Sequence, residues 1–106
     1  RVVNDQINNP TWTDSMADIL YLSIKKNISG IYHWGDADFV SRYDFAKIIA
    51  KTFNYDFSLI TPISTKELFQ NAPRPLKSGL KSDKIISALN VIPPSIDECL
   101  SKISIN

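Results

Sequence analysis

A group of polar residues near the start of the chain could contact a ligand. Asp5, Gln6 and Thr11 bring a carboxylate, an amide and a hydroxyl to one turn that leads into an expected helix, and Pro10 fixes the backbone there. Such groups, beside the free N–H donors of a helix start, suit a polyhydroxylated ligand. The structural alternative is that Asp5 and Asn8 only hold the turn and that Thr11 only caps the helix.

Arg74 is a second candidate for ligand contact. It stands between Pro73 and Pro75, and prolines on both sides stiffen the backbone. A stiff backbone reduces the entropy that is lost when the guanidinium binds an anion such as a phosphate. The alternative is a structural arginine that donates to loop carbonyls.

The other reactive side chains are assigned structural roles. His33 is expected to be a partly buried strand residue beside Trp34, and Cys99 a core thiol on the apolar stripe of the last helix. Asp36 and Asp38 could form an acid–base pair, but a solvated loop that caps a helix is the preferred interpretation.

Composition excludes several functional classes. The 106 residues carry a formal net charge of +1, which gives no strong field toward nucleic acid or an acidic membrane. One cysteine excludes an internal disulfide framework, and no apolar run could cross a membrane. The sequence has no GxGxxG, Walker, HExxH or EF-hand spacing. We therefore expect a cytoplasmic protein, and because residue 1 is an arginine in a β-prone run, a fragment of a larger one.

Four Ser/Thr-x-x-Asp/Glu boxes predict helix starts at Thr11, Ser41, Ser64 and Ser95. A further helix is expected over 82–89, and strands over 1–6, 31–34 and 57–61, the last one stopped by Pro62. Residues 71–76 are expected to form an ordered, extended loop.

Apolar residues recur at helical spacing behind three of these boxes. The first stripe, which is expected to be buried, consists of Ala17, Leu20, Tyr21 and Ile24. Strands that alternate with helices predict an α/β protein with parallel strand pairs. Three strands are few for a sheet covered on both faces, which again suggests missing sequence.

Five motifs then occur in the order in which one enzyme family has them. They are VNDQxNxPT at 3–11, GIYHWG at 30–35, SRYDFA at 41–46, IxPIxTxEL at 60–68 and AxRPxxSxL at 72–80. Over nearly its whole length the sequence thereby resembles the dTDP-4-dehydrorhamnose reductases, which are extended short-chain dehydrogenase/reductases. Asn8 stands where that family usually has Gly, and Lys77 where Asn is common.

The resemblance implies a fold and a division of labour. Residues 1–106 would form the α/β C-terminal substrate-binding portion, a few short strands alternating with about five helices, with the Rossmann half missing. The parent protein would use NADPH or NADH, bound by that half, to reduce dTDP-4-dehydro-L-rhamnose to dTDP-L-rhamnose. The family's catalytic Tyr-x-x-x-Lys set would also lie there, so Tyr43 and Lys47 share its spacing by coincidence.

The residues of this chain that the resemblance and the turn chemistry assign to the dTDP-sugar are Asp5, Gln6, Pro10, Thr11 and Arg74. No catalytic, cofactor-binding or metal-binding residue is expected in the chain itself.

Three other functions stay open. The parent could be another nucleotide-sugar epimerase or dehydratase, or a non-catalytic regulator that resembles the β subunit of methionine adenosyltransferase. The 106 residues could also be a free-standing binding module. If the Rossmann half is its natural partner, the chain alone should expose strand edges and apolar helix faces and should self-associate.

Overall fold

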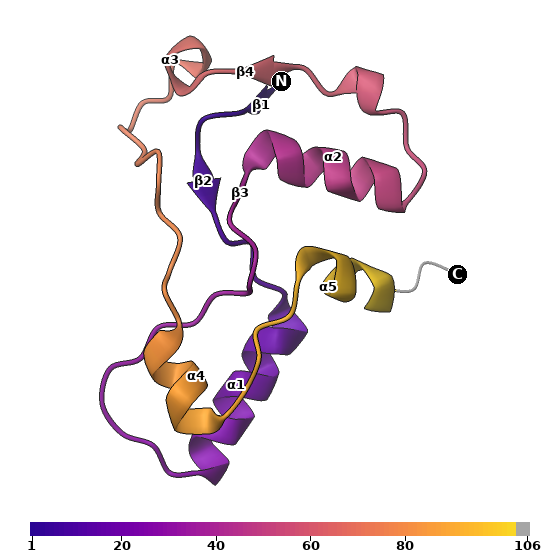
Figure 1. The fold of residues 1–106 in the computed structure, drawn as a ribbon. Helices are drawn as coiled ribbons and strands as arrows, with labels where there is room; N and C mark the ends of the chain where they lie inside the picture. The colour runs from indigo at the N-terminus through magenta and orange to yellow at the C-terminus, as the bar shows by residue number, and fades with distance from the viewer. Residues whose placement is uncertain (104–106) are drawn as a thin grey trace.

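The computed structural model describes residues 1–103 as an α/β fold with short strands and five α-helices (Figure 1). This confirms the expected fold class. The helices are α1 Thr13–Lys25, α2 Arg42–Thr52, α3 Thr65–Leu68, α4 Asp83–Leu89 and α5 Ile96–Lys102, with a 3₁₀ turn, η1, at Phe57–Leu59. The strands are β1 Val2–Val3, β2 Ile7–Asn8, β3 Val40–Ser41 and β4 Pro62–Ile63.

The strands form two small pairs. β1 lies parallel to β4, as expected of strands joined by helices, whereas β2 and β3 are antiparallel. Ile7 also bonds to the loop that follows α3, because its N–H donates to the Leu76 carbonyl (2.7 Å) and its carbonyl accepts from the Ser78 N–H (3.0 Å). These bonds explain why the proline-containing loop is ordered, as the sequence predicts.

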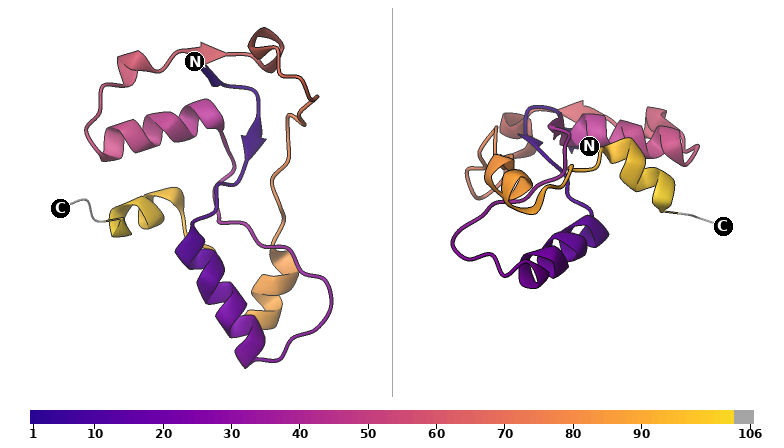
Figure 2. Two further views of the ribbon diagram at one scale, coloured as in Figure 1. Left: turned by 180° about the vertical axis from the view of Figure 1, so that it is seen from behind. Right: turned by 60° about the horizontal axis from the view of Figure 1, so that its bottom comes forward.

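The molecule is flat and open. Its Cα radius of gyration is 16.0 Å and its extents are 46 × 38 × 18 Å, whereas a compact chain of this length has a radius of about 13 Å. Figures 1 and 2 show the strands, α2 and α3 at one end and α1 and α4 at the other, joined by long connections. Much surface that a compact domain would bury is therefore left uncovered.

The main core lies between α1 and α4. Ile19, Trp34, Ile85 and Leu89 form its buried cluster, and Met16, Leu22 and Ile86 are among the residues that pack around it. This core buries one face of α1 only.

The exposed face of α1 is the one expected to be buried. Leu20, Tyr21 and Ile24 are 58%, 63% and 81% exposed, and the core instead takes Ile19 from the neighbouring stripe. The prediction was wrong because α1 carries apolar residues on two stripes, and α4 covers only one of them.

Helix capping follows the boxes, with one exception. Ser64 and Ser95 make complete capping boxes, and the Ser41 hydroxyl accepts from the Asp44 N–H (3.0 Å). At α1, however, the N-cap residue is Trp12 and its side chain makes no cap bond. Thr11 does not cap the helix, since its hydroxyl donates to the Asn9 carbonyl (3.2 Å).

Two predicted strands are absent from the described residues. Segment 31–34 has no strand partner within residues 1–103, and His33, expected to be partly buried, is exposed. Segment 57–61 begins with the 3₁₀ turn η1, because the Asp56 carboxylate accepts from the Ser58 N–H (2.9 Å). Pro62 does not end a strand but lies in β4, where the pair needs the carbonyls of Thr61 and Ile63 on that side.

Asn8 also differs from its expected turn role. It lies in β2 opposite Val40, and it is not one of the residues with a positive φ. A strand conformation suits asparagine as well as glycine, so this departure from the family pattern carries no backbone strain.

We predict that Leu89→Ala will lower the free energy of unfolding of the chain by about 2–5 kcal/mol, because Leu89 is 2% exposed at the centre of the core. Urea unfolding monitored by circular dichroism measures the change. The matched control is Leu59→Ala, where the side chain is 79% exposed and the expected change is within about 0.5 kcal/mol. Equal effects of the two substitutions would contradict this description of the core.

Candidate functional site

The polar residues at the start of the chain form a hydrogen-bonded cluster with α3. The Thr65 N–H and hydroxyl donate to the Asp5 carboxylate, at 3.0 Å and 2.6 Å. The buried Gln6 amide donates to the Thr65 hydroxyl (3.1 Å) and to the Gln70 side-chain oxygen (2.9 Å). Asp5 and Gln6, which are neighbours in the sequence, therefore share one cluster, and both of them hold α3 in position.

The Asp5 carboxylate is stabilised in its charged form by this cluster. The Thr65 hydroxyl and then the Thr65 N–H hold the pKa of Asp5 below its ordinary value of 3.8. An aspartate with a lowered pKa stabilises the fold above pH 3.8, and this stabilisation is lost as pH falls through the lower folded pKa.

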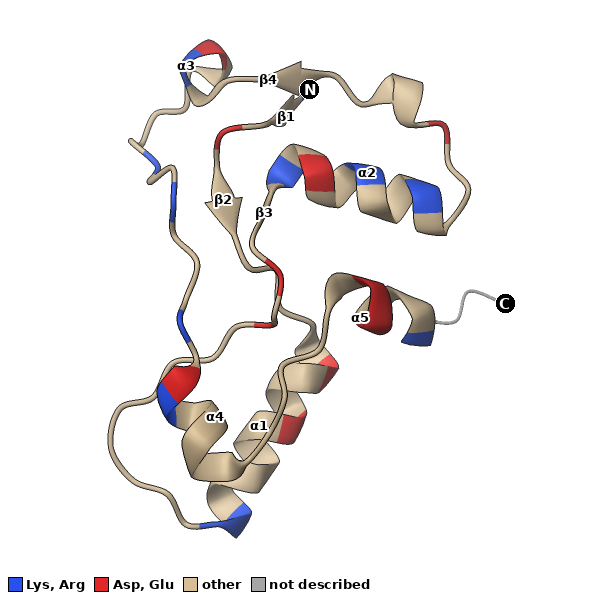
Figure 3. Cartoon of the chain, viewed as in Figure 1, with Lys and Arg blue, Asp and Glu red and all other residues tan. Residues whose placement is uncertain are grey.

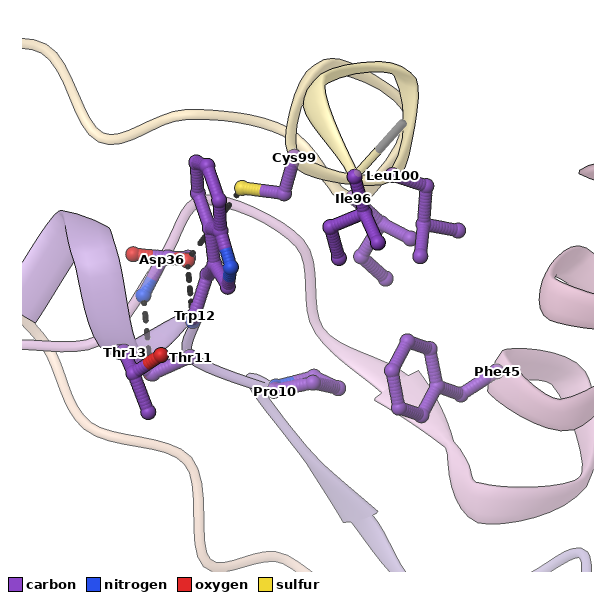
Figure 4. A pocket seen from close by; sticks show the side chains of 10 residues that line it. Pro10, Thr11, Trp12, Thr13, Asp36, Phe45, Ile96, Cys99 and Leu100 are labelled. Atoms are coloured by element: carbon purple, nitrogen blue, oxygen red, sulfur yellow. Dashed lines mark hydrogen bonds between the residues drawn. The ribbon is translucent and has the colours of Figure 1, made fainter. Parts of the chain in front are cut away.

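Pro10 and Thr11 line a different feature, a cavity of about 250 Å³ (Figure 4). The connection from β2 to α1 forms one wall, α5 forms another, and Phe45 of α2 closes the side. The lining is mostly apolar, with a few polar groups. It consists of Pro10, Thr11, Trp12, Thr13, Asp36, Phe45, Ile96, Cys99, Leu100 and Ile103.

Asp36 is the buried charge of this cavity. It is 2% exposed, and its carboxylate accepts from the Trp12 N–H (2.9 Å) and the Ser15 hydroxyl (2.6 Å). The expectation of a solvated loop is wrong for Asp36, but the capping role is right, because Asp36 supplies the acceptor at the start of α1. Asp38 does the same for α5, accepting from the Ile96 N–H (2.7 Å).

Cys99 is a buried free thiol, as predicted. Burial, followed by the nearby Asp36 carboxylate, raises the pKa of Cys99 to about 11. Its sulfur donates to Asp36 Oδ2 at 3.6 Å. Because the thiol stays protonated at neutral pH, Cys99 lines the cavity as an apolar group and not as a nucleophile.

Asn9 holds the backbone behind the cavity, a role that the sequence did not reveal. Its side-chain amide donates to the carbonyls of Asp36 (3.0 Å) and Leu80 (3.1 Å), and its oxygen accepts from the Leu80 N–H (2.9 Å). A Cβ at Gly35 would overlap the Asn9 side chain, and a Cβ at Gly79 would overlap Phe39. Glycine at these two positions was the signal in the sequence that another part of the chain approaches the backbone closely there.

Arg74 lies apart from both features. It is exposed on the loop between α3 and α4, which carries several basic residues (Figure 3) and lies at the opposite edge of the molecule from α5. The structure thus brings Asp5 and Gln6 together, places Pro10 and Thr11 at the cavity, and leaves Arg74 on the outer loop.

Comparison with known proteins assigns this arrangement to a family. Residues 1–104 match the family described as RmlD substrate binding domain. The chain belongs to this family. The family relationship predicted from the five motifs is thereby confirmed.

Relatives with assigned names are nucleotide-sugar and polysaccharide proteins. The spore coat polysaccharide biosynthesis protein SpsK of Bacillus subtilis is 32% identical over 83% of this chain and 30% of its own length. The dTDP-4-dehydrorhamnose reductase of Aggregatibacter actinomycetemcomitans is 32% identical over 96% of this chain and 38% of its own length. The chain therefore spans about a third of the length of these relatives.

Solved structures share the fold. The dTDP-4-dehydrorhamnose reductase of Bacillus anthracis, in complex with NADP, superposes with a TM-score of 0.85 and 28% identity over 95% of this chain and 36% of that one. The reductase of Yersinia enterocolitica gives a TM-score of 0.79 at 24% identity, which supports the fold alone.

The described residues contain neither a membrane-spanning helix nor a cluster of metal-binding side chains. Within residues 1–103, no helix has the length and hydropathy needed to cross a bilayer. The same residues contain no group of three or more His, Cys, Asp or Glu side chains that could hold a metal ion.

We predict that Thr65→Val will raise the pKa of Asp5 toward 3.8, because valine keeps the shape of threonine but removes the hydroxyl donor. Carbon-detected NMR titration of the Asp5 carboxyl group measures it. The control is Thr52→Val, whose hydroxyl bonds to the Ile48 carbonyl in α2 and should leave Asp5 unchanged. An unaltered Asp5 pKa in Thr65→Val would contradict the proposed cause of the shift.

Proposed function

We propose that this chain is the sugar-nucleotide-binding part of a dTDP-4-dehydrorhamnose reductase, and that the parent protein reduces dTDP-4-dehydro-L-rhamnose to dTDP-L-rhamnose. One observation carries the proposal. The fold of 95% of the chain superposes, with a TM-score of 0.85, on a reductase of that name that contains NADP. The matching substrate-binding family supports the same assignment.

The cavity beside Pro10 and Thr11 suits part of such a ligand. A dTDP-sugar combines apolar surface, on the thymine ring and the sugar methyl group, with hydroxyl groups. The apolar walls from Phe45 and Leu100 can cover the former, while the Thr13 hydroxyl and the remaining lone pair of the Thr11 hydroxyl offer polar contacts. We propose this cavity as one end of the substrate site.

Asp5, Gln6 and Arg74 lie outside this cavity, and we propose them as further contacts of the sugar nucleotide in the parent protein. Asp5 and Gln6 present a fixed carboxylate and amide, since Thr65 holds both of them. Arg74, on its proline-stiffened loop with Lys77 and Lys81 nearby in sequence, suits the diphosphate. A fixed polar wall loses little entropy when the ligand binds.

NADPH would supply the hydride in the parent protein, but the residues of this chain do not fit it. A dinucleotide loop needs three glycines within six residues, whereas Gly30, Gly35 and Gly79 are spread over fifty. We propose that the cofactor is held by parts of the parent outside these 106 residues. The chain's own role is to bind and orient the sugar nucleotide.

A second candidate substrate is another dTDP-4-keto-6-deoxysugar. The dTDP-4-keto-6-deoxy-D-glucose reductase of Streptomyces niveus is 27% identical over 77% of this chain. This sugar has a different configuration but is reduced at the same carbon. Its reduction would again need this chain to bind the sugar nucleotide and the rest of the parent protein to bind the cofactor.

The test is NADPH oxidation by the full-length parent protein with dTDP-4-dehydro-L-rhamnose. Arg74→Ala and Gln6→Ala should each raise the KM for the sugar nucleotide by about 10-fold, the effect of losing a charge-assisted or buried hydrogen bond, while NADPH affinity is unchanged. Arg42→Ala, an exposed arginine on α2, is the matched control.

Two results would contradict the proposal at different levels. Unchanged Michaelis constants in both variants would remove these residues from the site. Absence of turnover with every dTDP-4-keto-6-deoxysugar tested would remove the reductase function itself.

The Thr65→Val variant separates two roles of Gln6. If Thr65→Val raises the KM as much as Gln6→Ala does, Gln6 acts by holding α3 and not by touching the ligand.

We also propose that the chain studied alone self-associates, since its flat shape leaves apolar side chains uncovered. Light scattering should show a weight-average mass that rises with concentration above the 12.0 kDa of one chain. A constant mass of one chain at high concentration, with no binding of a dye for apolar surface, would contradict this.

A further inference from the structure

The loop that carries Arg74 is attached to the start of the chain by backbone hydrogen bonds. We refer to residues 70–81 as the Arg74 loop. The Ile7 N–H donates to the Leu76 carbonyl (2.7 Å), and the Ile7 carbonyl accepts from the Ser78 N–H (3.0 Å). This is the bonding pattern of two parallel strands.

The Asn9 side chain extends this pairing by one step. If the parallel pattern continued, the Leu80 N–H would donate to the Asn9 backbone carbonyl. It donates instead to Asn9 Oδ1 (2.9 Å), and Asn9 Nδ2 donates to the Leu80 carbonyl (3.1 Å). The side-chain amide thus takes the place of a backbone peptide group and holds the end of the Arg74 loop.

The Asn9 backbone carbonyl is thereby available to Thr11. It accepts from the Thr11 hydroxyl (3.2 Å), and the same hydroxyl accepts from the Asp36 N–H (3.2 Å; Figure 4). Asn9 Nδ2 also donates to the Asp36 carbonyl (3.0 Å). Asn9, Thr11 and Asp36 therefore form a closed ring of hydrogen bonds beside the cavity.

This ring determines which partner the Thr11 hydroxyl can accept. A hydroxyl has one donor hydrogen and two acceptor lone pairs. The hydrogen is used on Asn9 and one lone pair on Asp36, so a further partner must donate to the second lone pair. A sugar hydroxyl can do so, whereas a keto oxygen or a phosphate oxygen cannot.

We propose that Asn9 is a positioning residue of the sugar-nucleotide site. Its side chain holds the Arg74 loop, and its backbone carbonyl makes the Thr11 hydroxyl an acceptor for a hydroxyl group of the sugar. One residue thus fixes the separation between the contact for the diphosphate and the contact for the sugar. This inference rests on the proposed function, which assigns Arg74 and Thr11 to those two parts of the ligand.

The physical effect of Asn9 on binding is a saving in entropy. A loop that is held before the ligand arrives loses less freedom when its guanidinium binds the diphosphate. Without the Asn9 bonds, part of the interaction energy of Arg74 is spent on ordering the loop. The contribution of Arg74 to affinity should therefore depend on Asn9.

The first test is a double-mutant cycle in the full-length parent protein, with the dissociation constant of dTDP-L-rhamnose measured by calorimetry. Asn9→Leu keeps the approximate volume and removes the three side-chain bonds. Arg74→Ala should raise the dissociation constant about 10-fold in the unsubstituted protein but less than about 3-fold in Asn9→Leu. Equal factors in the two backgrounds would overturn the proposal.

A second variant keeps part of the interaction. Asn9→Asp retains the oxygen that accepts from the Leu80 N–H and loses both donor bonds. Its dissociation constant should lie between those of the unsubstituted protein and Asn9→Leu. A constant equal to that of the unsubstituted protein would overturn the role of the donor bonds.

The matched control separates positioning from stability. Ser82→Ala removes the two bonds of a buried hydroxyl to the Gly35 backbone (2.9 and 3.2 Å) and leaves those of Asn9 and Thr11 intact. It should lower the melting temperature by several degrees, as Asn9→Leu does, and change the dissociation constant less than about 2-fold. If it weakens binding as much as Asn9→Leu, Asn9 acts through stability alone and the proposal fails.

The second test addresses the Thr11 hydroxyl with analogues of dTDP-L-rhamnose in which fluorine replaces one sugar hydroxyl at a time. Fluorine cannot donate a hydrogen bond. At one position the replacement should weaken binding about 10-fold in the unsubstituted protein and have no effect in Thr11→Val. The absence of any position whose effect depends on Thr11 would overturn the acceptor role.

Both tests measure binding and not turnover, so two kinds of failure can be told apart. If the protein binds dTDP-L-rhamnose but the effects of Asn9 and Arg74 are independent, the inference fails and the proposed ligand remains. If the unsubstituted protein binds no dTDP-sugar, the proposed function fails and the inference fails with it.

Discussion

The buried carboxylate of Asp36 is the interaction on which the arrangement of the chain most depends. Through it the start of α1, the Gly35–Asp36 backbone and α5 meet at one point, since it accepts from Trp12 and Ser15 and lies against the thiol of Cys99. Hydrogen bonds to a charged group contribute about 1.5–3 kcal/mol each, and a buried charge without them would be strongly unfavourable. The cavity lined by Pro10 and Thr11 exists because Asp36 fixes two of its walls.

Polar groups in this chain serve the structure first. Asp5 and Gln6 are engaged with Thr65, so under the proposed function they would contact a ligand only through the lone pairs that these hydrogen bonds leave free. A site of this kind is rigid before the ligand arrives. Its residues are hard to assign by substitution alone, because removing one of them loosens α3 as well, and this is why matched variants at Thr65 carry information that alanine substitutions lack.

Local features were predictable from the sequence, and features that need a distant partner were not. The boxes at Ser64 and Ser95 depend on four consecutive residues, and both form as expected. Which stripe of α1 is buried depends on how far the neighbouring helix reaches, and pattern alone cannot decide it. The burial of Asp36 was likewise invisible, because its donors lie more than twenty residues away. The order of the motifs identified the family. It did not show which of the assigned residues line the same cavity.

The pairing of β1 with β4 has a consequence for biosynthesis. Val2 and Val3 must wait for Pro62 and Ile63 before they acquire a strand partner, and the thiol beside Asp36 arrives only with the final helix. Contacts that join such distant points form slowly. During synthesis β1 therefore stays without its strand partner until β4 has left the ribosome, and over that interval this part of the nascent chain is open to chaperones and proteases.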